Sequence, residues 1–156
     1  MKILFLSHRY PFPPTGGAQI RAFHVISHLA KRHEVVVGSL VRSEEERRAG
    51  AGLEEHCART FGARVRTLPA LARSAALLPT RTPSTMGYFW SSELRDWVDH
   101  ELETGDYDLV FAYCTSVAPY VAKARGMPKV LDFVDMDSQK WLSYAAFKPW
   151  PLSWGY

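Results

Sequence analysis

The stretch that decides the fold is residues 2–41, KILFLSHRYPFPPTGGAQIRAFHVISHLAKRHEVVVGSLV. Residues 2–6 form a short apolar run, which is typical of a strand buried on both faces of a sheet. Over residues 18–32 the apolar side chains recur at helical spacing, which predicts an amphipathic helix. Residues 34–41 predict a second buried strand. The stretch therefore predicts a strand, a helix and a second strand that runs parallel to the first.

The same alternation of strands and helices continues along the rest of the chain. It predicts one Rossmann-like α/β domain over residues 1–156, with a doubly wound parallel sheet and helices on both faces. The expected elements are a helix at 43–62 with Ser43 as N-cap and a break at Gly50 and Gly52, a strand at 63–70 ended by Pro69, a short helix and loop at 70–83, a helix at 84–103, a strand at 107–114, a short helix at 116–125 and a fifth strand within 128–138.

Composition and charge limit the class of partner. The chain has 156 residues, of which 47% are hydrophobic and 22% charged, which is ordinary globular usage. A net charge of +3 is too small for a dedicated nucleic-acid binder, so no nucleic acid is expected. No carboxylate lies between Glu55 and Glu93, however, although five arginines fall within 59–81. Such a segment could contact phosphates or an anionic membrane, and it is equally compatible with a solvated basic face.

The two cysteines and the apolar segments bear on location. Cys57 and Cys114 do not have the spacing of a zinc site, and two distant cysteines do not make a disulfide framework. We expect no metal and a reduced, cytoplasmic compartment. No segment resembles a signal peptide or reaches the roughly 18 apolar residues of a membrane-spanning helix.

The first candidate site lies between the first strand and the first helix. Ligands of open α/β sheets bind beyond the carboxyl ends of the strands, and a helix N-terminus suits phosphate groups. Gly16 and Gly17 have no Cβ, so a ligand could come close to their backbone. The spacing matches neither GxGxxG nor a P-loop, which disfavours a nicotinamide dehydrogenase and a P-loop NTPase. The alternative is a plain helix start after a loop.

Two further segments follow the fourth and fifth strands. Asp135 and Asp137 lie at or beyond the end of the fifth strand, where they could bind sugar hydroxyls, although Asp137 could equally cap a helix. Asp132 lies inside that strand, so its carboxylate needs a partner. Thr115 after the fourth strand could bind a ligand or cap a helix, and Cys114 has no His and acid near it in sequence.

Aromatic residues and prolines dominate the tail, residues 139–156. It is too apolar to be a finished solvent surface. We expect it to contact protein that this chain lacks, or to lie in a membrane interface. Exposed aromatic residues and uncovered sheet edges also predict self-association.

Three segments carry a family resemblance: residues 2–41, YDLVFAYCTSVAPYVA at 107–122 and KVLDFVDMDSQKWLSYAA at 129–146. Together they resemble the N-terminal domain of a GT-B glycosyltransferase of family 4, the retaining group that uses nucleotide-sugar donors. They are similar in particular to the sugar transferases found with bacterial exosortase and exopolysaccharide gene clusters.

The resemblance implies two Rossmann-like domains that face each other across a cleft. The N-terminal domain binds a glycan or lipid-linked acceptor, and its loop, here Gly16 and Gly17, reaches toward the donor phosphates. The C-terminal domain holds most of the residues that bind the nucleotide-sugar donor, and it is not found in this chain, so we expect no transferase activity from these 156 residues alone. No metal or cofactor is implied, and the place of action is cytoplasmic or at the inner face of the membrane.

The sequence departs from the family at two positions. Many relatives carry His where this chain has Tyr113, and His where it has Val134, so only Asp135 remains as a catalytic candidate. The alternative function is a non-catalytic Rossmann-like module that binds a phosphate-bearing ligand or a partner protein. The candidate residues for acceptor or substrate binding are His8, Arg9, Thr15, Arg21, Tyr113, Thr115, Asp135 and Asp137.

Overall fold

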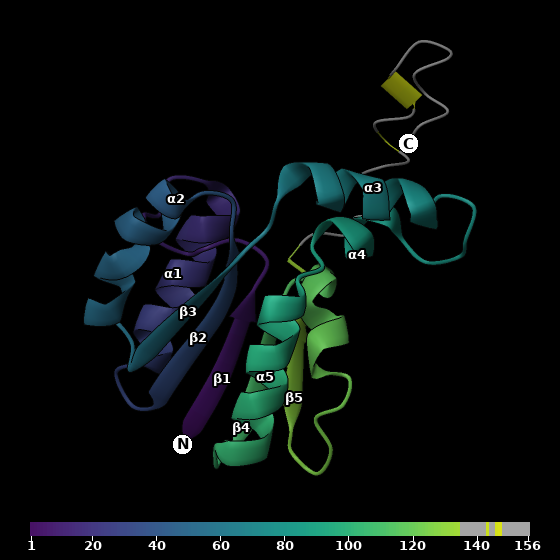
Figure 1. Ribbon diagram of the computed structural model, residues 1–156. Helices are drawn as coiled ribbons and strands as arrows, with labels where there is room; N and C mark the ends of the chain where they lie inside the picture. The colour runs from purple at the N-terminus through teal and green to yellow at the C-terminus, as the bar shows by residue number, and fades with distance from the viewer. Residues whose placement is uncertain (135–142, 144–145, 148–156) are drawn as a thin grey trace.

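The computed structural model describes residues 1–134, 143 and 146–147. Within them, five parallel strands form one sheet in the order β3-β2-β1-β4-β5, with helices on both faces (Figure 1). This confirms the α/β fold with a doubly wound parallel sheet. The strands are β1 (Lys2–Ser7), β2 (Glu34–Val41), β3 (Arg59–Arg64), β4 (Leu109–Tyr113) and β5 (Lys129–Asp132).

The helices divide between the two faces of the sheet. In Figure 1, α1 and α2 lie on one side of the sheet, and α5 lies on the other. The helical elements are α1 (Gly17–Leu29), α2 (Glu44–Ala49), the 3-10 helix η1 (Gly50–Glu55), α3 (Thr67–Leu77), α4 (Ser84–Tyr88), α5 (Ser92–Thr104) and the 3-10 helix η2 (Thr115–Val121).

The apolar run of β1 is continuous because both of its faces are buried. Phe5 packs with Ile26 of α1 in a core on one side of the sheet. Leu4 and Leu6 belong to a second core on the other side, which includes Leu94 of α5. The central strand therefore contributes to two separate hydrophobic cores, as a doubly wound sheet requires.

The third strand lies at Arg59–Arg64, and the prediction of a strand at 63–70 was wrong. β3 is an edge strand with few apolar residues, so its hydrophobic pattern is weak. Pro69, read as the end of that strand, instead lies in the first turn of α3, where proline is tolerated. The helix expected over 43–62 is only α2 followed by η1.

The helix expected over 84–103 is two helices, α4 and α5, with a break before Ser92. At the break, the Ser91 side chain accepts a hydrogen bond from the Leu94 amide and caps α5. The Ser91 amide donates to the hydroxyl of Tyr120 at 2.7 Å, and that hydroxyl donates to the Phe89 carbonyl at 2.6 Å. A side chain from η2 thus satisfies the backbone groups that the break leaves open.

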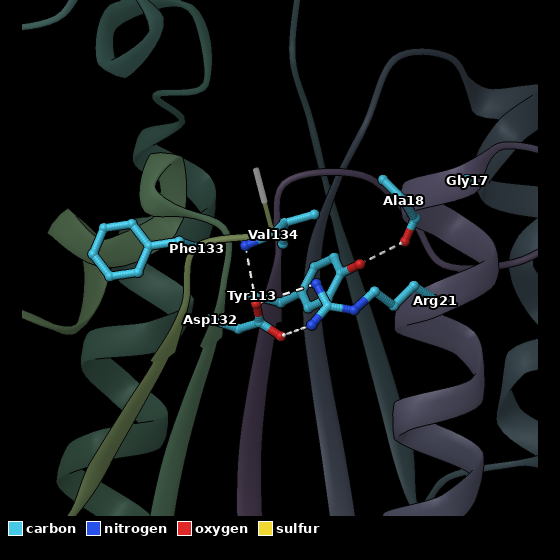
Figure 2. A pocket seen from close by; sticks show the side chains of 7 residues that line it. All are labelled: Gly17, Ala18, Arg21, Tyr113, Asp132, Phe133 and Val134. Atoms are coloured by element: carbon cyan, nitrogen blue, oxygen red, sulfur yellow. Dashed lines mark hydrogen bonds and ion pairs between the residues drawn. The ribbon is translucent and has the colours of Figure 1, made fainter. Parts of the chain in front are cut away.

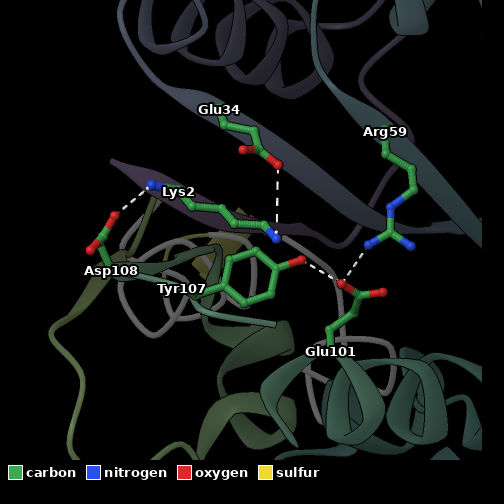
Figure 3. A network of polar contacts seen from close by, with 6 residues as sticks. All are labelled: Lys2, Glu34, Arg59, Glu101, Tyr107 and Asp108. Carbon is green, nitrogen blue, oxygen red and sulfur yellow. Dashed lines mark hydrogen bonds and ion pairs between the residues drawn. The ribbon is translucent and has the colours of Figure 1, made fainter. Parts of the chain in front are cut away.

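A polar network lies at the amino end of the sheet (Figure 3). The buried carboxylate of Glu101 on α5 pairs with Arg59 at 2.6 Å and accepts a hydrogen bond from the hydroxyl of Tyr107. Burial and this hydrogen bond raise the pKa of Tyr107. The Lys2 ammonium lies 4.9 Å from the centre of the Tyr107 ring and 3.8 Å from a carboxylate oxygen of Glu34. These contacts join β1, β2, β3 and α5 at the end of the sheet that lies opposite the candidate site.

In the part of the chain that the structure describes, no helix has the length and apolar character needed to cross a membrane.

Candidate functional site

An open pocket of about 880 Å³ lies at the carboxyl ends of β4 and β5, against the N-terminus of α1 (Figure 2). β4 is the neighbour of β1, the strand that α1 follows. The chain leaves β1 toward one face, through α1, and leaves β4 toward the other, through η2. The pocket therefore lies next to the topological switch point between β1 and β4, where ligands of open α/β sheets bind. The pocket is lined by Gly17, Ala18, Arg21, Tyr113, Asp132, Phe133 and Val134.

The N-terminus of α1 forms one wall of this pocket. Gly16 is the N-cap, in an extended conformation, and Gly17 is the first helical residue. A Cβ on Gly17 would meet no atom within 4 Å, so this residue faces open space. The loop before the helix is fixed by Gln19, whose side-chain amide donates to the Tyr10 carbonyl at 2.9 Å. The first turn of α1 holds no acidic side chain, so the positive end of the helix is unopposed there.

Arg21 and Asp132 form a bidentate ion pair across the pocket. The guanidinium nitrogens donate to the two carboxylate oxygens at 3.2 and 2.8 Å. One of these oxygens also accepts from the Val134 amide at 2.9 Å. The expectation that Asp132 needs a partner is thereby confirmed, and the partner is Arg21. Because Arg21 is half-exposed, a pair of this kind contributes only about 0–1 kcal/mol to stability.

Tyr113 forms the floor between the two walls. Its hydroxyl donates to the Ala18 carbonyl at 3.1 Å, which ties the start of α1 to the end of β4. The Arg21 guanidinium lies 5.6 Å from the centre of its ring, and the ring stacks on Phe5. Burial raises the pKa of Tyr113, so the hydroxyl stays protonated and keeps donating at neutral pH. Tyr113 was expected in the site and lies in it.

Val134 has a positive φ of 64°, which is strained for a β-branched residue. It lies at the edge of the pocket, at the position where the family resemblance expects a histidine. Strained residues of this type concentrate at functional sites. The next candidates along the chain, Asp135 and Asp137, lie outside the described residues.

His8 lies apart from the pocket, beside Cys114. β1 and β4 bring the two residues together, although the sequence shows no histidine near Cys114. Cys114 has a φ of 89°, and its sulfur lies 3.7 Å from the Ser116 hydroxyl. Burial raises the pKa of the Cys114 thiol, but its interactions with His8 and Ser116 outweigh burial and lower the pKa to about 7. The buried Nδ1 of His8 has no hydrogen-bond partner among the described residues.

The remaining candidates do not line the main pocket. His8 and Arg9 line a second hollow of only about 10 Å³, which is too small for any ligand larger than a water molecule. Thr15 is exposed in the loop before α1, and Thr115 is the first residue of η2. The structure therefore brings together Gly17, Arg21 and Tyr113 and leaves the other described candidates outside.

Sequence reasoning missed four residues that line the pocket: Ala18, Asp132, Phe133 and Val134. The sequence indicates that Asp132 is a strand residue that needs a partner, but it is also the last residue of β5 and therefore lies at the ligand-binding edge. That position was the signal that could have identified it. Phe133 follows directly and is largely exposed, a property that sequence alone does not give.

Among the described residues, no group of three or more His, Cys, Asp and Glu side chains could hold a metal ion. The scan against protein-family models and the searches of curated proteins and of solved structures gave no match to this chain.

Proposed function

We propose that this chain is the acceptor-side domain of a retaining glycosyltransferase, which transfers a sugar from a nucleotide-sugar to an acceptor in exopolysaccharide or cell-surface glycan synthesis. The observation that carries the proposal is the pocket next to the switch point, where the Arg21–Asp132 pair lies beside the N-terminus of α1. The motifs that resemble family 4 glycosyltransferases supply the reaction class. The fold alone would not, because Rossmann-like domains host many functions.

The pocket has the chemistry of a site for a sugar. Sugar hydroxyls both donate and accept hydrogen bonds, and the Arg21 guanidinium and the Asp132 carboxylate offer donors and acceptors side by side. The exposed ring of Phe133 adds apolar surface to the same pocket. A few convergent polar groups on a largely apolar wall are typical of small-molecule sites.

The charges of the pocket suit a secondary contact with the donor diphosphate. Arg21 is neutralised by Asp132, so the attraction for an anion comes mainly from the N-terminus of α1. Tight binding of the diphosphate then falls to the second domain that the resemblance implies. In the reaction, positive potential at helix ends and basic side chains would stabilise the charge that develops on the leaving diphosphate. Asp135 stays the candidate for a catalytic carboxylate.

The test is expression of the complete reading frame that contains this chain, followed by a screen of nucleotide-sugars for release of nucleoside diphosphate. We expect Arg21→Gln to lower kcat/KM by about tenfold or more, because it removes the guanidinium and frees the Asp132 carboxylate from its partner. Arg32→Gln, at an exposed arginine beyond the other end of α1, is the matched control and should have full activity. Wild-type activity in the Arg21 variant, or no turnover of any nucleotide-sugar, would contradict the proposal.

The alternative is a non-catalytic module that binds a phosphate-bearing ligand or a partner protein. One observation favours it: Asp132, the one carboxylate that lines the pocket among the described residues, is already bound by Arg21 and the Val134 amide. Thermal shift with pyrophosphate and nucleoside diphosphates distinguishes the two functions. Stabilisation by these ligands without turnover by the complete protein would favour the module.

A further inference from the structure

The outer face of α3 is apolar and exposed. Leu68 is 80% exposed, Leu71 51% and Leu78, the residue that caps the helix, 73%. Together with the exposed Ala75, these residues follow one another at helical spacing and share one side of α3, which we call the leucine stripe. Single exposed leucines are normal on protein surfaces, but three on one side of a short helix form a patch that calls for a partner.

The orientation of α3 is fixed by its contacts with α4. The Arg73 guanidinium donates to the carbonyls of Gly87 at 3.1 Å and Trp90 at 2.8 Å, and the Ser74 hydroxyl donates to the Ser84 carbonyl at 2.9 Å. A Cβ on Gly87 would lie 2.9 Å from the backbone of Arg73, so the two helices approach as closely as glycine allows. These bonds occupy the side of α3 opposite the leucine stripe, so the stripe points away from the protein.

The charged residues in the segment that contains α3 are all arginines. No acidic residue occurs between Glu55 and Glu93. Two arginines of this segment are used inside the protein: Arg59 pairs with Glu101, and Arg73 binds α4. Arg66 and Arg81 are exposed just before and just after α3. The leucine stripe is therefore flanked at both ends by cations, and no carboxylate of the segment neutralises them.

The position of α3 agrees with docking on a surface. It lies beyond the carboxyl ends of the strands, near α4 and apart from the two helical layers that cover the sheet (Figure 1). The candidate pocket opens at the same end of the sheet. A flat partner that covered α3 would thus lie at the same end of the sheet as the pocket.

We propose that α3 docks this chain on an anionic lipid bilayer. The leucine stripe enters the boundary between headgroups and acyl chains, and Arg66 and Arg81 contact lipid phosphates, as in amphipathic helices that lie in a membrane interface. Charge complementarity selects this occupant: exposed leucines between two exposed arginines, in a segment without acidic residues, match negative headgroups above hydrocarbon. The proposal does not depend on the glycosyltransferase function, because lipid binding is measured without sugar or nucleotide.

The test is co-sedimentation of the full chain with vesicles of phosphatidylcholine alone or mixed with phosphatidylglycerol. We expect binding to the mixed vesicles at low salt that weakens as salt screens the charges. The triple variant Leu68→Gln/Leu71→Gln/Leu78→Gln should bind at least about tenfold more weakly, because it removes the apolar surface that enters the bilayer. Arg66→Gln/Arg81→Gln should weaken binding by about fivefold for each arginine.

The matched control is Arg32→Gln/Arg48→Gln, which removes the same charge at exposed positions away from α3 and should bind as the wild type does. Thermal melts check that all variants are folded, which exposed positions should permit. Three outcomes would overturn the proposal: no binding to the mixed vesicles at low salt, binding that survives the leucine substitutions, or equal loss in the control pair. A wild-type dimer that the leucine variant converts to a monomer would also overturn it, because a second copy would then cover the stripe.

Discussion

His8 and Cys114 show how single residues that are distant in sequence become chemically coupled. Each follows a strand, and because β1 and β4 are neighbours, the imidazole lies beside the thiol. No local pattern predicts that they are neighbours, because the order of strands in a sheet does not follow from local sequence. The same holds for Arg21 and Asp132. The need of Asp132 for a partner was predictable from its place in a strand, but its partner lies 111 residues away.

We expect the Cys114 thiol to titrate near neutral pH. Burial raises its pKa, but His8 and Ser116 lower it to about 7, whereas burial raises the pKa of Cys57 to about 11. The thiolate absorbance near 240 nm should therefore rise with a midpoint near pH 7 in the wild type. It should keep that midpoint in Cys57→Ser and lose it in Cys114→Ser. His8→Ala should move the midpoint upward, and an unchanged midpoint would mean that the imidazole does not stabilise the thiolate.

The ionisation of the Cys114 thiol should also make the free energy of unfolding depend on pH. The pKa of Cys114 is lower in the folded protein than the value of about 8.5 in an unfolded chain, so its ionisation stabilises the fold above that value. This contribution is lost as pH falls through about 7. The wild type should therefore gain about 2 kcal/mol of unfolding free energy relative to Cys114→Ser between about pH 6 and 9. Urea denaturation at a series of pH values measures this difference.

At the scale of elements, the break between α4 and α5 shows where periodicity misleads. Apolar residues recur at helical spacing through residues 84–103, so the pattern predicts one helix. Instead, α4 ends at Tyr88 and α5 begins at Ser92. Tyr120 stabilises the interruption by bonding both the Ser91 amide and the Phe89 carbonyl. A contact from η2 thus overrides the local pattern, and Ser91 was the residue that could have signalled a new helix start.

We expect Ser91→Ala to lower the free energy of unfolding by about 1 kcal/mol, because the side chain is the N-cap of α5 and its replacement leaves the Leu94 amide without that partner. Ser92→Ala is the matched control. Ser92 is exposed and lies one residue inside the helix, so this change should stay within about 0.5 kcal/mol of the wild type. Chemical denaturation measures both. An equal effect of the two substitutions would show that Ser91 does not cap the helix.

At the scale of the whole molecule, the sheet was predictable because most of its strands are buried. β1 and β2 have continuous apolar runs, since both of their faces are covered, and such runs are visible in sequence. The edge strand β3 was misplaced because an edge strand needs fewer apolar residues. The pocket was predictable in place, from the rule that ligands bind at the carboxyl edge, but its lining depended on strand order.

The two edges of the sheet also differ in how they are protected. β3 carries exposed arginines at both ends, Arg59 and Arg64, and charged side chains discourage pairing with another edge. β5 has Val130 and Leu131 about 40% and 41% exposed. The carbonyls of Pro128 and Asp132 bond to β4, so by alternation the backbone groups of Leu131 point away from the sheet. The outer side of β5 is therefore the edge more prone to pair with a second copy of the chain.

We expect the chain to self-associate at high concentration and Leu131→Lys to weaken this association by at least about tenfold. Charged edge residues oppose strand pairing, and across a two-fold interface the added charges would repel each other. Ile20→Lys adds the same charge on α1, at a side chain that is equally exposed, and should leave association unchanged. Light scattering over a concentration series measures all three proteins. A wild type that stays monomeric contradicts the prediction, and an equal effect of both lysines would attribute association to net charge and not to the edge of β5.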